Sequence, residues 1–393
     1  MSDAFDQFLY GELKSIDEAG LLRSLRRIET PQQVEVHSGD RKLINFSSND
    51  YLGLAAHESL RMAARDGVET LGAGAGSARL ISGSQTIAHE FEARLAAFKQ
   101  TEAALSFSSG YAAALGAVPA LIGQGDVVII DKLVHASLVD AARLSGAKLR
   151  VFKHNDLDDL EDILQWSSGR DGNTLIITES VFSMDGDLAP VRDLVQLKNR
   201  YGAWLMLDEA HATGLYGEGR RGIAEEMDVA DGVEVQLGTL GKALGAAGGY
   251  ICGSQALIDL LVNRARSFIF STAPVPAQLS AAKRGVELVQ SNEGEALRTR
   301  LWANVDALKN GLLQQGWKLP VMRSAILPLM ISDEREALAL AERLREAGVW
   351  VPAVRYPAVA RGAARLRVTV SAAHQPKHLD ALLDALGSGT ADA

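Results

Sequence analysis

Between residues 127 and 272, short apolar runs alternate with segments whose hydrophobic positions repeat with a helical period. One helical segment, Val191–Gly202, ends at a glycine, which is a common stop signal for a helix. Nearly continuous apolar strands that alternate with helices are typical of a largely parallel sheet covered on both faces. The apolar runs predict seven strands, at Val127–Asp131, Leu149–His154, Thr174–Ser180, Trp204–His211, Val235–Thr239, Gly249–Ser254 and Ser267–Thr272.

The pattern changes after about residue 290 and predicts a smaller α+β region. Its predicted elements are helix Leu301–Gly316, strand Ala325–Ser332, a helix with Ser332 as N-cap and Gly348 as stop, strand Leu366–Ala372, and a closing helix. The first forty residues are mostly helical in pattern. We therefore predict an α/β protein with an N-terminal arm at 1–45, a large domain at 46–288 and a small domain at 289–393.

One apolar segment calls for a comparison with membrane helices. Ala103–Gly125 holds 23 residues without a charge, which is long enough to span a bilayer. It consists mostly of alanine, glycine and serine, and it includes Gly110 and Pro119. This composition favours a helix buried in a soluble core over a membrane span.

Charge and composition exclude several classes of function. A net charge of −9 argues against a nucleic-acid or anionic-membrane partner, which would require a clustered basic face. The single cysteine, Cys252, excludes intramolecular disulfides and cysteine-based metal sites. The first twenty residues are acidic and have no apolar core, unlike a secretory signal. We expect a cytoplasmic protein without a metal site.

Lys242 stands in a glycine-rich turn between two predicted strands, and three interpretations are open for it. It is a phosphate-binding P-loop lysine, a covalent catalytic lysine, or a solvated charge. The P-loop pattern is not met, because Ala243 follows the lysine where a hydroxyl is required and Gln236 occupies the position of the first glycine. A nucleoside triphosphatase (NTPase) is therefore disfavoured.

Three further features have both a structural and a functional interpretation. Asp208 ends a predicted strand, and ligands of parallel sheets bind beyond the carboxyl ends of strands. Ser109 and Gly110 precede an alanine-rich helix and form either an anion site or a simple N-cap. His135, taken alone, is more often structural. Together with Lys242, however, these features match pyridoxal phosphate, which needs a lysine, an acid for its ring nitrogen and a phosphate cradle.

Eight motifs in one order resemble the α-oxoamine synthase family of fold-type I pyridoxal-phosphate enzymes. They lie at Asn45–Leu54, Ser108–Ala117, His135–Ala147, Thr178–Val191, Leu207–Gly222, Gly238–Tyr250, Phe268–Pro276 and Ala364–His374. The resemblance implies a large domain with a mostly parallel seven-stranded sheet between helices, a smaller α+β C-terminal domain and an N-terminal helical arm. It also implies a homodimer with active sites between the subunits.

The resemblance assigns a residue of this chain to each expected contact with the cofactor. Lys242 forms the Schiff base with pyridoxal phosphate, Asp208 binds the pyridine nitrogen, His211 binds the phenolic oxygen, and His135 stacks on the ring. The resemblance assigns further cofactor contacts to Ser109, Gly110, Tyr111, Glu179, Ser183 and Thr239, and to Ser271 and Thr272 of the neighbouring subunit.

The resemblance also implies a reaction and a substrate side. Within the family the motifs favour the branch of biotin synthesis, which condenses L-alanine with a pimeloyl thioester, carried by coenzyme A or acyl carrier protein, with loss of CO2. Arg367 would bind the amino-acid carboxylate, and Arg23 and Asn49 would line the substrate side. The family's substrate-contacting threonine is replaced by Ala358, which leaves the acyl partner open. Sibling activities are the alternative: glycine C-acetyltransferase, 5-aminolevulinate synthase or a serine palmitoyltransferase-like enzyme.

Overall fold

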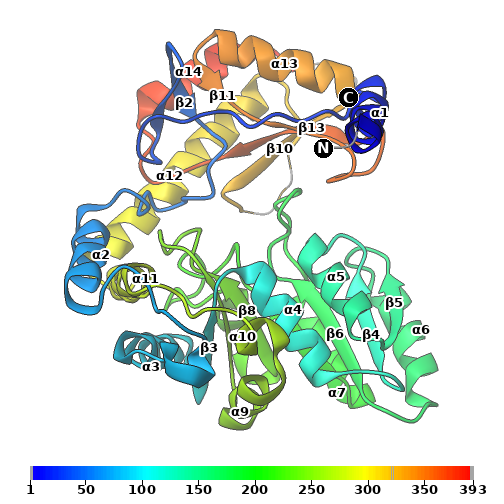
Figure 1. Cartoon of the computed structure of the whole chain (residues 1–393). Helices are drawn as coiled ribbons and strands as arrows, with labels where there is room; N and C mark the ends of the chain where they lie inside the picture. The colour runs from blue at the N-terminus through cyan, green and yellow to red at the C-terminus, as the bar shows by residue number, and fades with distance from the viewer. Residues whose placement is uncertain (1–2, 320, 322, 390–393) are drawn as a thin grey trace.

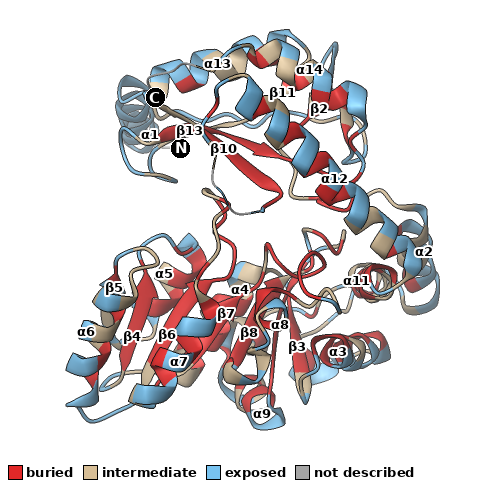
Figure 2. Ribbon diagram, turned by 180° about the vertical axis from the view of Figure 1, so that it is seen from behind, coloured by how far each residue is buried: buried red, intermediate tan, exposed pale blue. Residues whose placement is uncertain are grey.

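The computed structural model describes residues 3–319, 321 and 323–389, which form two lobes joined along one side (Figure 1). The lower lobe in that view is built on a seven-stranded sheet, and the upper lobe on two three-stranded sheets. Colouring by burial shows that the strands of the large sheet, apart from the edge strand at 148–152, are buried along most of their length (Figure 2). The core of the lower lobe therefore lies on both faces of this sheet.

The large sheet is mostly parallel, as the alternating pattern predicts. Every neighbouring pair is parallel except the two pairs made by β9, which runs antiparallel to both of its neighbours. Sheet order is β3 (Ala103–Phe107), β9 (Gly249–Gly253), β8 (Val235–Thr239), β7 (Trp204–Asp208), β6 (Thr174–Glu179), β4 (Val127–Asp131) and β5 (Lys148–Phe152). Six of these strands match the predicted ones.

Helices cover both faces of this sheet. One group, α4, α5, α9 and α10, packs together on one face, and α6 and α7 pack together on the other (Figures 1 and 2). A further group, α2, α3 and α11, packs beside the edge strand β3. The bounds are α2 (Glu58–Leu71), α3 (Thr86–Lys99), α4 (Gly110–Leu121), α5 (Ala136–Leu144), α6 (Leu157–Ser168), α7 (Val191–Tyr201), α8 (Ile223–Glu226), α9 (Gln255–Arg264), α10 (Arg266–Ile269) and α11 (Pro276–Val289), with a π-helix η1 (Arg79–Gly83) and a 3-10 turn η2 (Ala230–Gly232).

Two predicted elements of this lobe are wrong. The segment Ala103–Gly125 is not one helix, because its first five residues form β3 and the helix begins only at Gly110. Alanine favours helices, but the ladder of hydrogen bonds to β9 overrides that preference here. No helix in the described part of the chain combines the length and the hydropathy that a membrane crossing requires.

The predicted strand Ser267–Thr272 is instead the short helix α10 followed by a loop. Its apolar residues do not share one buried face. Phe268 packs edge-on against Phe107, whereas the side chain of Phe270 is 70% exposed. The segment is not part of the large sheet, and Thr272 instead forms a bridge with Ala78.

The upper lobe combines the C-terminal region with a strand pair from the N-terminus. One of its sheets has the order β10 (Ile326–Ser332), β13 (Ala364–Thr369), β12 (Ala353–Val354), and the other β1 (Glu35–Ser38), β2 (Arg41–Asn45), β11 (Val349–Trp350). Three helices, α12 (Asn292–Gln314), α13 (Glu334–Glu346) and α14 (Pro376–Leu386), complete the lobe, and α1 (Asp3–Glu18) lies beside it. The N-cap of α13 is Asp333 and not the predicted Ser332, because the Asp333 carboxylate accepts the backbone N–H groups of Arg335 and Glu336.

A buried ion pair ties the edge strand β3 to its surroundings. The Arg79 guanidinium makes two hydrogen bonds to the Glu92 carboxylate, at 2.8 and 2.9 Å, and both side chains are buried. Glu92 also accepts hydrogen bonds from the backbone N–H and the hydroxyl of Ser106 in β3. One carboxylate thus joins η1, α3 and β3.

We predict that Glu92→Ala lowers the free energy of unfolding by about 3–5 kcal/mol, because it leaves the Arg79 charge buried without a partner. Urea denaturation followed by circular dichroism measures the loss. The matched control is Glu90→Ala on the same helix, which removes the exposed pair with Lys283 and should cost at most about 1 kcal/mol. Equal losses in the two variants would contradict the prediction.

Candidate active site

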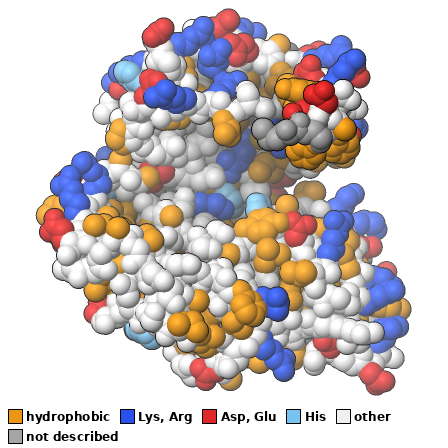
Figure 3. Space-filling view, viewed as in Figure 1, with side chains coloured by type: hydrophobic (Ala, Val, Ile, Leu, Met, Phe, Trp, Pro, Cys, Tyr) orange, Lys and Arg blue, Asp and Glu red, His pale blue; other side chains and the backbone are white. Residues whose placement is uncertain are grey.

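Three neighbouring parallel strands end at one small cavity. Glu179 is the last residue of β6, Asp208 of β7 and Thr239 of β8, and all three line a cavity of about 170 Å³. The cavity is also lined by Lys242, by His135 and His211, and by Gly110 and Tyr111. In the space-filling view, basic and histidine side chains gather in the hollow between the two lobes (Figure 3). The carboxyl edge of the sheet thus brings together eight of the predicted site residues.

Lys242 reaches this cavity from the turn that follows β8. The turn is closed by hydrogen bonds from Gly245 N–H to the Lys242 carbonyl and from Ala246 N–H to the Leu240 carbonyl. Gly245 has a φ of 66°, and a Cβ there would lie 2.4 Å from the Cβ of Leu54. Only glycine fits both the backbone conformation and the space, so the turn that carries Lys242 is fixed by its neighbours.

The amine of Lys242 is held in an unusual electrostatic environment. Its Nζ lies 2.7 Å from Nε2 of His211. Burial lowers the pKa of Lys242 to about 8, the Arg367 charge adds to this effect, and the carboxylates of Asp208 and Glu179 oppose it. A lysine with this pKa is partly deprotonated near neutral pH, and its neutral amine is both a nucleophile and a base.

The two carboxylates differ in charge at neutral pH. Burial raises the pKa of Asp208 to about 6, with the Lys242 charge opposing it. Burial together with the Asp208 charge raises the pKa of Glu179 to about 8. As the pH rises, Asp208 therefore loses its proton before Glu179 does. Glu179 instead orders its surroundings, because its Oε1 accepts the backbone N–H of His135 at 2.6 Å.

A chain of polar side chains leads from the lysine to the upper lobe. His211 Nδ1 lies 2.6 Å from the hydroxyl of Tyr51, which donates to Oδ1 of Asn49 at 3.3 Å. The same Asn49 oxygen accepts from the Arg367 guanidinium at 3.0 Å. Burial and the Lys242 charge lower the pKa of His211 well below its ordinary value, so this imidazole is neutral.

Tyr51 was not among the residues that sequence reasoning selected. It lies in the motif Asn45–Leu54, which carries part of the family resemblance, but a tyrosine next to apolar residues gives no signal of its own. The structure shows that its hydroxyl fixes the second nitrogen of His211. A neutral imidazole has one N–H donor and one acceptor nitrogen, and the partner of one nitrogen sets the role of the other.

An anion cradle stands opposite the lysine at the start of α4. The Ser109 hydroxyl caps the helix by accepting the backbone N–H of Ala112 at 3.0 Å. The first turn of a helix leaves backbone N–H groups without an intrahelical partner, and Gly110 and Tyr111 of this turn line the cavity. A Cβ at Gly110 would lie 3.7 Å from the Thr239 side chain. The two predicted interpretations of Ser109 are therefore compatible, since an N-cap and an anion site share this helix start.

The remaining predicted residues divide into two groups. Ser183 joins the site through its carbonyl, which accepts the Arg367 Nε–H at 2.5 Å. His135 caps α5 and lines the cavity, and burial and the Lys242 charge lower its pKa. Eight predicted residues stand outside the cavity lining in this single chain. Ser109, Ser183, Asn49 and Arg367 are linked to the site by the hydrogen bonds described above, whereas Arg23, Ser271, Thr272 and Ala358 are not.

Comparison with known proteins matches almost the whole chain. A family model described as aminotransferase class I and II matches residues 41–386. An 8-amino-7-oxononanoate synthase from Geobacter sulfurreducens is 46% identical and covers 96% of each chain, and one from Citrifermentans bemidjiense is 45% identical and covers 94% of each. A serine palmitoyltransferase from S. paucimobilis, solved with bound PLP-myriocin, superposes with a TM-score of 0.91 at 28% identity and covers 98% of each chain.

We predict that Asp208→Asn lowers the pKa of Lys242 further below 8, because the removed carboxylate is the first of the two that favour the ammonium form. The pH dependence of Lys242 acetylation in cofactor-free protein, quantified by peptide mass spectrometry, measures this shift. The labelled fraction should rise at lower pH in the variant. Labelling of the exposed Lys148 is the internal control and should not change. A labelling midpoint of Lys242 that rises or stays the same would refute the electrostatic argument.

Proposed function

The chain belongs to the aminotransferase class I and II family, and from that membership we propose that it is an 8-amino-7-oxononanoate synthase. The proposed reaction is an acyl transfer of biotin synthesis, in which L-alanine condenses with a pimeloyl thioester and CO2 and the free thiol are released. The observation that carries it is the 41–46% identity to several 8-amino-7-oxononanoate synthases over nearly the full length of both chains. The resemblance inferred from the motifs is confirmed.

Pyridoxal phosphate is the cofactor of this enzyme. The residues of the cavity fit it, because an amine, a carboxylate and a set of unpaired helix N–H groups line one small space. In the proposed assignment Lys242 forms the Schiff base, Asp208 binds the ring nitrogen and His211 the phenolic oxygen. The phosphate is bound by the start of α4 and by Thr239. When bound, the cofactor accepts the electron pair left at the α-carbon of the amino acid.

The protein's own groups provide the proton transfers. With a pKa of about 8, the Lys242 amine is available near neutral pH to take the α-proton at Nζ and to return it. The Asp208 carboxylate favours a protonated ring nitrogen because it is a buried negative charge. Arg367 and Asn49 would bind the substrate carboxylate, since the guanidinium already meets Asn49 at 3.0 Å.

The choice among sibling activities depends on the amino acid and the acyl chain. A solved serine palmitoyltransferase and a solved 8-amino-7-oxononanoate synthase are both 28% identical to this chain, so the structural likeness does not separate the two activities. Several 8-amino-7-oxononanoate synthases, however, are 41–46% identical over nearly the full length of both chains. Ala358 lies in a turn closed by its N–H to the Arg355 carbonyl and offers no hydroxyl to a substrate. The identity therefore favours the biotin reaction, and the acyl carrier, coenzyme A or acyl carrier protein, is left to experiment.

We also propose that the enzyme is a cytoplasmic homodimer with the domains 1–45, 46–288 and 289–393. Large apolar side chains are exposed next to the predicted cross-subunit residues Ser271 and Thr272. Ile81 is 81% exposed and Phe270 is 70% exposed, and the two segments meet at a bridge between Ala78 and Thr272. A second subunit would cover this apolar surface and bring Ser271 and Thr272 to its own cavity.

The proposed reaction is tested by adding L-alanine, glycine or L-serine, each with pimeloyl-coenzyme A or pimeloyl-acyl carrier protein, to the purified holoenzyme. Thiol release and CO2 measure turnover. We expect turnover with L-alanine and a pimeloyl thioester, at a kcat/KM at least about tenfold above that of the other amino acids. Lys242→Ala should lose activity by about 10²-fold or more, and Lys148→Ala should retain it. Preference for glycine or L-serine would assign the chain to a sibling activity.

A charged residue introduced into this apolar surface tests the proposed dimer. Ile81→Glu should shift the protein from dimer to monomer in analytical ultracentrifugation, because an unpaired carboxylate would be buried between the subunits. Leu313→Glu on α12, a side chain that is 47% exposed, is the matched control and should stay dimeric. Activity should fall with the loss of the dimer if Ser271 and Thr272 act across subunits. A wild-type protein that sediments as a monomer would overturn the proposal.

A further inference from the structure

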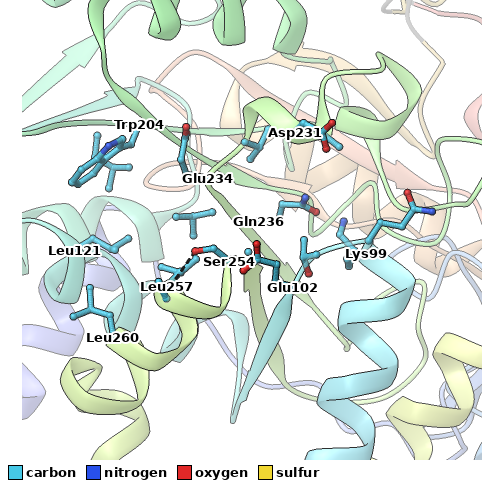
Figure 4. A pocket seen from close by; sticks show the side chains of 18 of the residues that line it. Lys99, Glu102, Leu121, Trp204, Asp231, Glu234, Gln236, Ser254, Leu257 and Leu260 are labelled. Carbon is cyan, nitrogen blue, oxygen red and sulfur yellow. Dashed lines mark hydrogen bonds between the residues drawn. The ribbon is translucent and has the colours of Figure 1, made fainter.

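A second and larger cavity, of about 590 Å³, lies at the opposite edge of the central sheet. Its walls come from the first residues of β7 and β8, from the end of β9 and from helix α9 (Figure 4). It shares no lining residue with the candidate active site, which lies at the other ends of the same strands. Its volume falls in the range of about 300–1,000 Å³ that is usual for small-molecule sites.

One end of this cavity is apolar. Leu121 from the end of α4, Trp204 from the start of β7, and Leu257 and Leu260 from α9 gather there (Figure 4). Together these side chains offer an apolar wall to a ligand, and burial of apolar surface is the general driving force for binding a hydrocarbon chain. This end fits a chain of methylene groups or an aromatic ring.

The other end holds two buried polar side chains with unused hydrogen-bonding capacity. Gln236 in β8 is only 5% exposed, and its carboxamide has no hydrogen-bond partner among residues 3–319, 321 and 323–389. Lys99 is 3% exposed, and within the described structure its ammonium makes one hydrogen bond, to the Arg221 carbonyl. Buried polar groups are normally paired, and an ammonium has three donors. Both side chains therefore lack partners that a ligand can supply.

The charges around the cavity favour an anion at this end. Lys99 hydrogen-bonds the Arg221 carbonyl, and none of its printed hydrogen bonds among the described residues goes to a carboxylate. Burial lowers the pKa of the Lys99 ammonium, and the charges of Glu209 and Glu225 oppose this shift from a distance beyond hydrogen bonding. Three acids also line the cavity, Glu102, Asp231 and Glu234, but all three are exposed to solvent, and Glu234 is paired with Lys198. Glu102 in addition accepts the backbone N–H of Gln255 at 2.8 Å. Water and salt weaken the field of exposed charges far more than that of a buried one, so the field of Lys99 prevails inside the cavity.

We propose that this cavity binds a medium-chain carboxylate. The head group accepts hydrogen bonds from the Lys99 ammonium and the Gln236 amide, and the hydrocarbon chain extends toward Trp204 and Leu260. The proposed binding site is distinct from the candidate active site, because the two cavities share no lining residue. Its existence does not depend on the identity of the amino-acid substrate.

Isothermal titration calorimetry of the holoenzyme with sodium octanoate tests the proposal. Octylammonium chloride and octan-1-ol serve as probes with the same chain and a different head group. We expect saturable binding of one octanoate per chain, at least about tenfold tighter than either control. Equal binding of all three probes would show that the cavity selects only for apolar chains, and the absence of octanoate binding at millimolar concentration would also overturn the proposal.

Three variants locate the binding. Lys99→Met should weaken octanoate binding by about tenfold or more, and Gln236→Leu by about threefold to tenfold, because they remove a charged and a neutral hydrogen bond respectively. Leu260→Trp fills the apolar end and should abolish binding even if Lys99→Met fails to fold. Lys148 is an exposed lysine at the amino end of β5, and the control variant Lys148→Met should bind octanoate like the wild type. Unchanged affinity in Gln236→Leu and Leu260→Trp would refute the assignment to this cavity.

Discussion

The burial of one lysine opposite two carboxylates is the constraint on which the candidate site depends. Removing Lys242, Asp208 and Glu179 from water is costly for each charge, and their mutual attraction offsets only part of this cost. The pKa values shift as a result, Lys242 downward and both acids upward. A fold that holds these groups together keeps one proton mobile among them near neutral pH, which is what a proton-transferring site requires.

The parallel sheet is what makes this arrangement possible. Because β6, β7 and β8 are parallel neighbours, their last residues lie side by side. Glu179 of β6 is in register with Asp208 of β7, and Asp208 is in register with Leu237 of β8. The antiparallel β9 then returns the chain, and the turn between β8 and β9 presents Lys242 to the same edge. The loop after β7 places His211 against that lysine.

The sequence predicted these local features well and the long-range ones poorly. Six strands, the lysine turn and the acid at a strand end follow from local patterns, and the structure brings them together as expected. The strand at Ala103–Phe107 could not be predicted, because its extended form depends on pairing with β9, which is about 150 residues away. The same holds for the hydrogen bond from Arg367 to Asn49 and for the role of Tyr51, since each needs a partner that no neighbouring residue reveals. The assignments of Arg23, Ser271, Thr272 and Ala358 rest on the family alone.

Two lysines lie near the two ends of strand β8 and differ in their hydrogen-bond partners. Beyond its carboxyl end Lys242 lies between two carboxylates, and their negative charge limits how far its pKa falls. Near its amino end Lys99 is buried beside Gln236 with a carbonyl as its hydrogen-bond partner. A lysine supplied with carboxylates can exchange a proton within the protein, whereas a buried ammonium without a bonded carboxylate attracts an anion from outside. The same strand thus supports a site suited to proton transfer at one end and, by the same electrostatic reasoning, a site suited to reversible binding at the other.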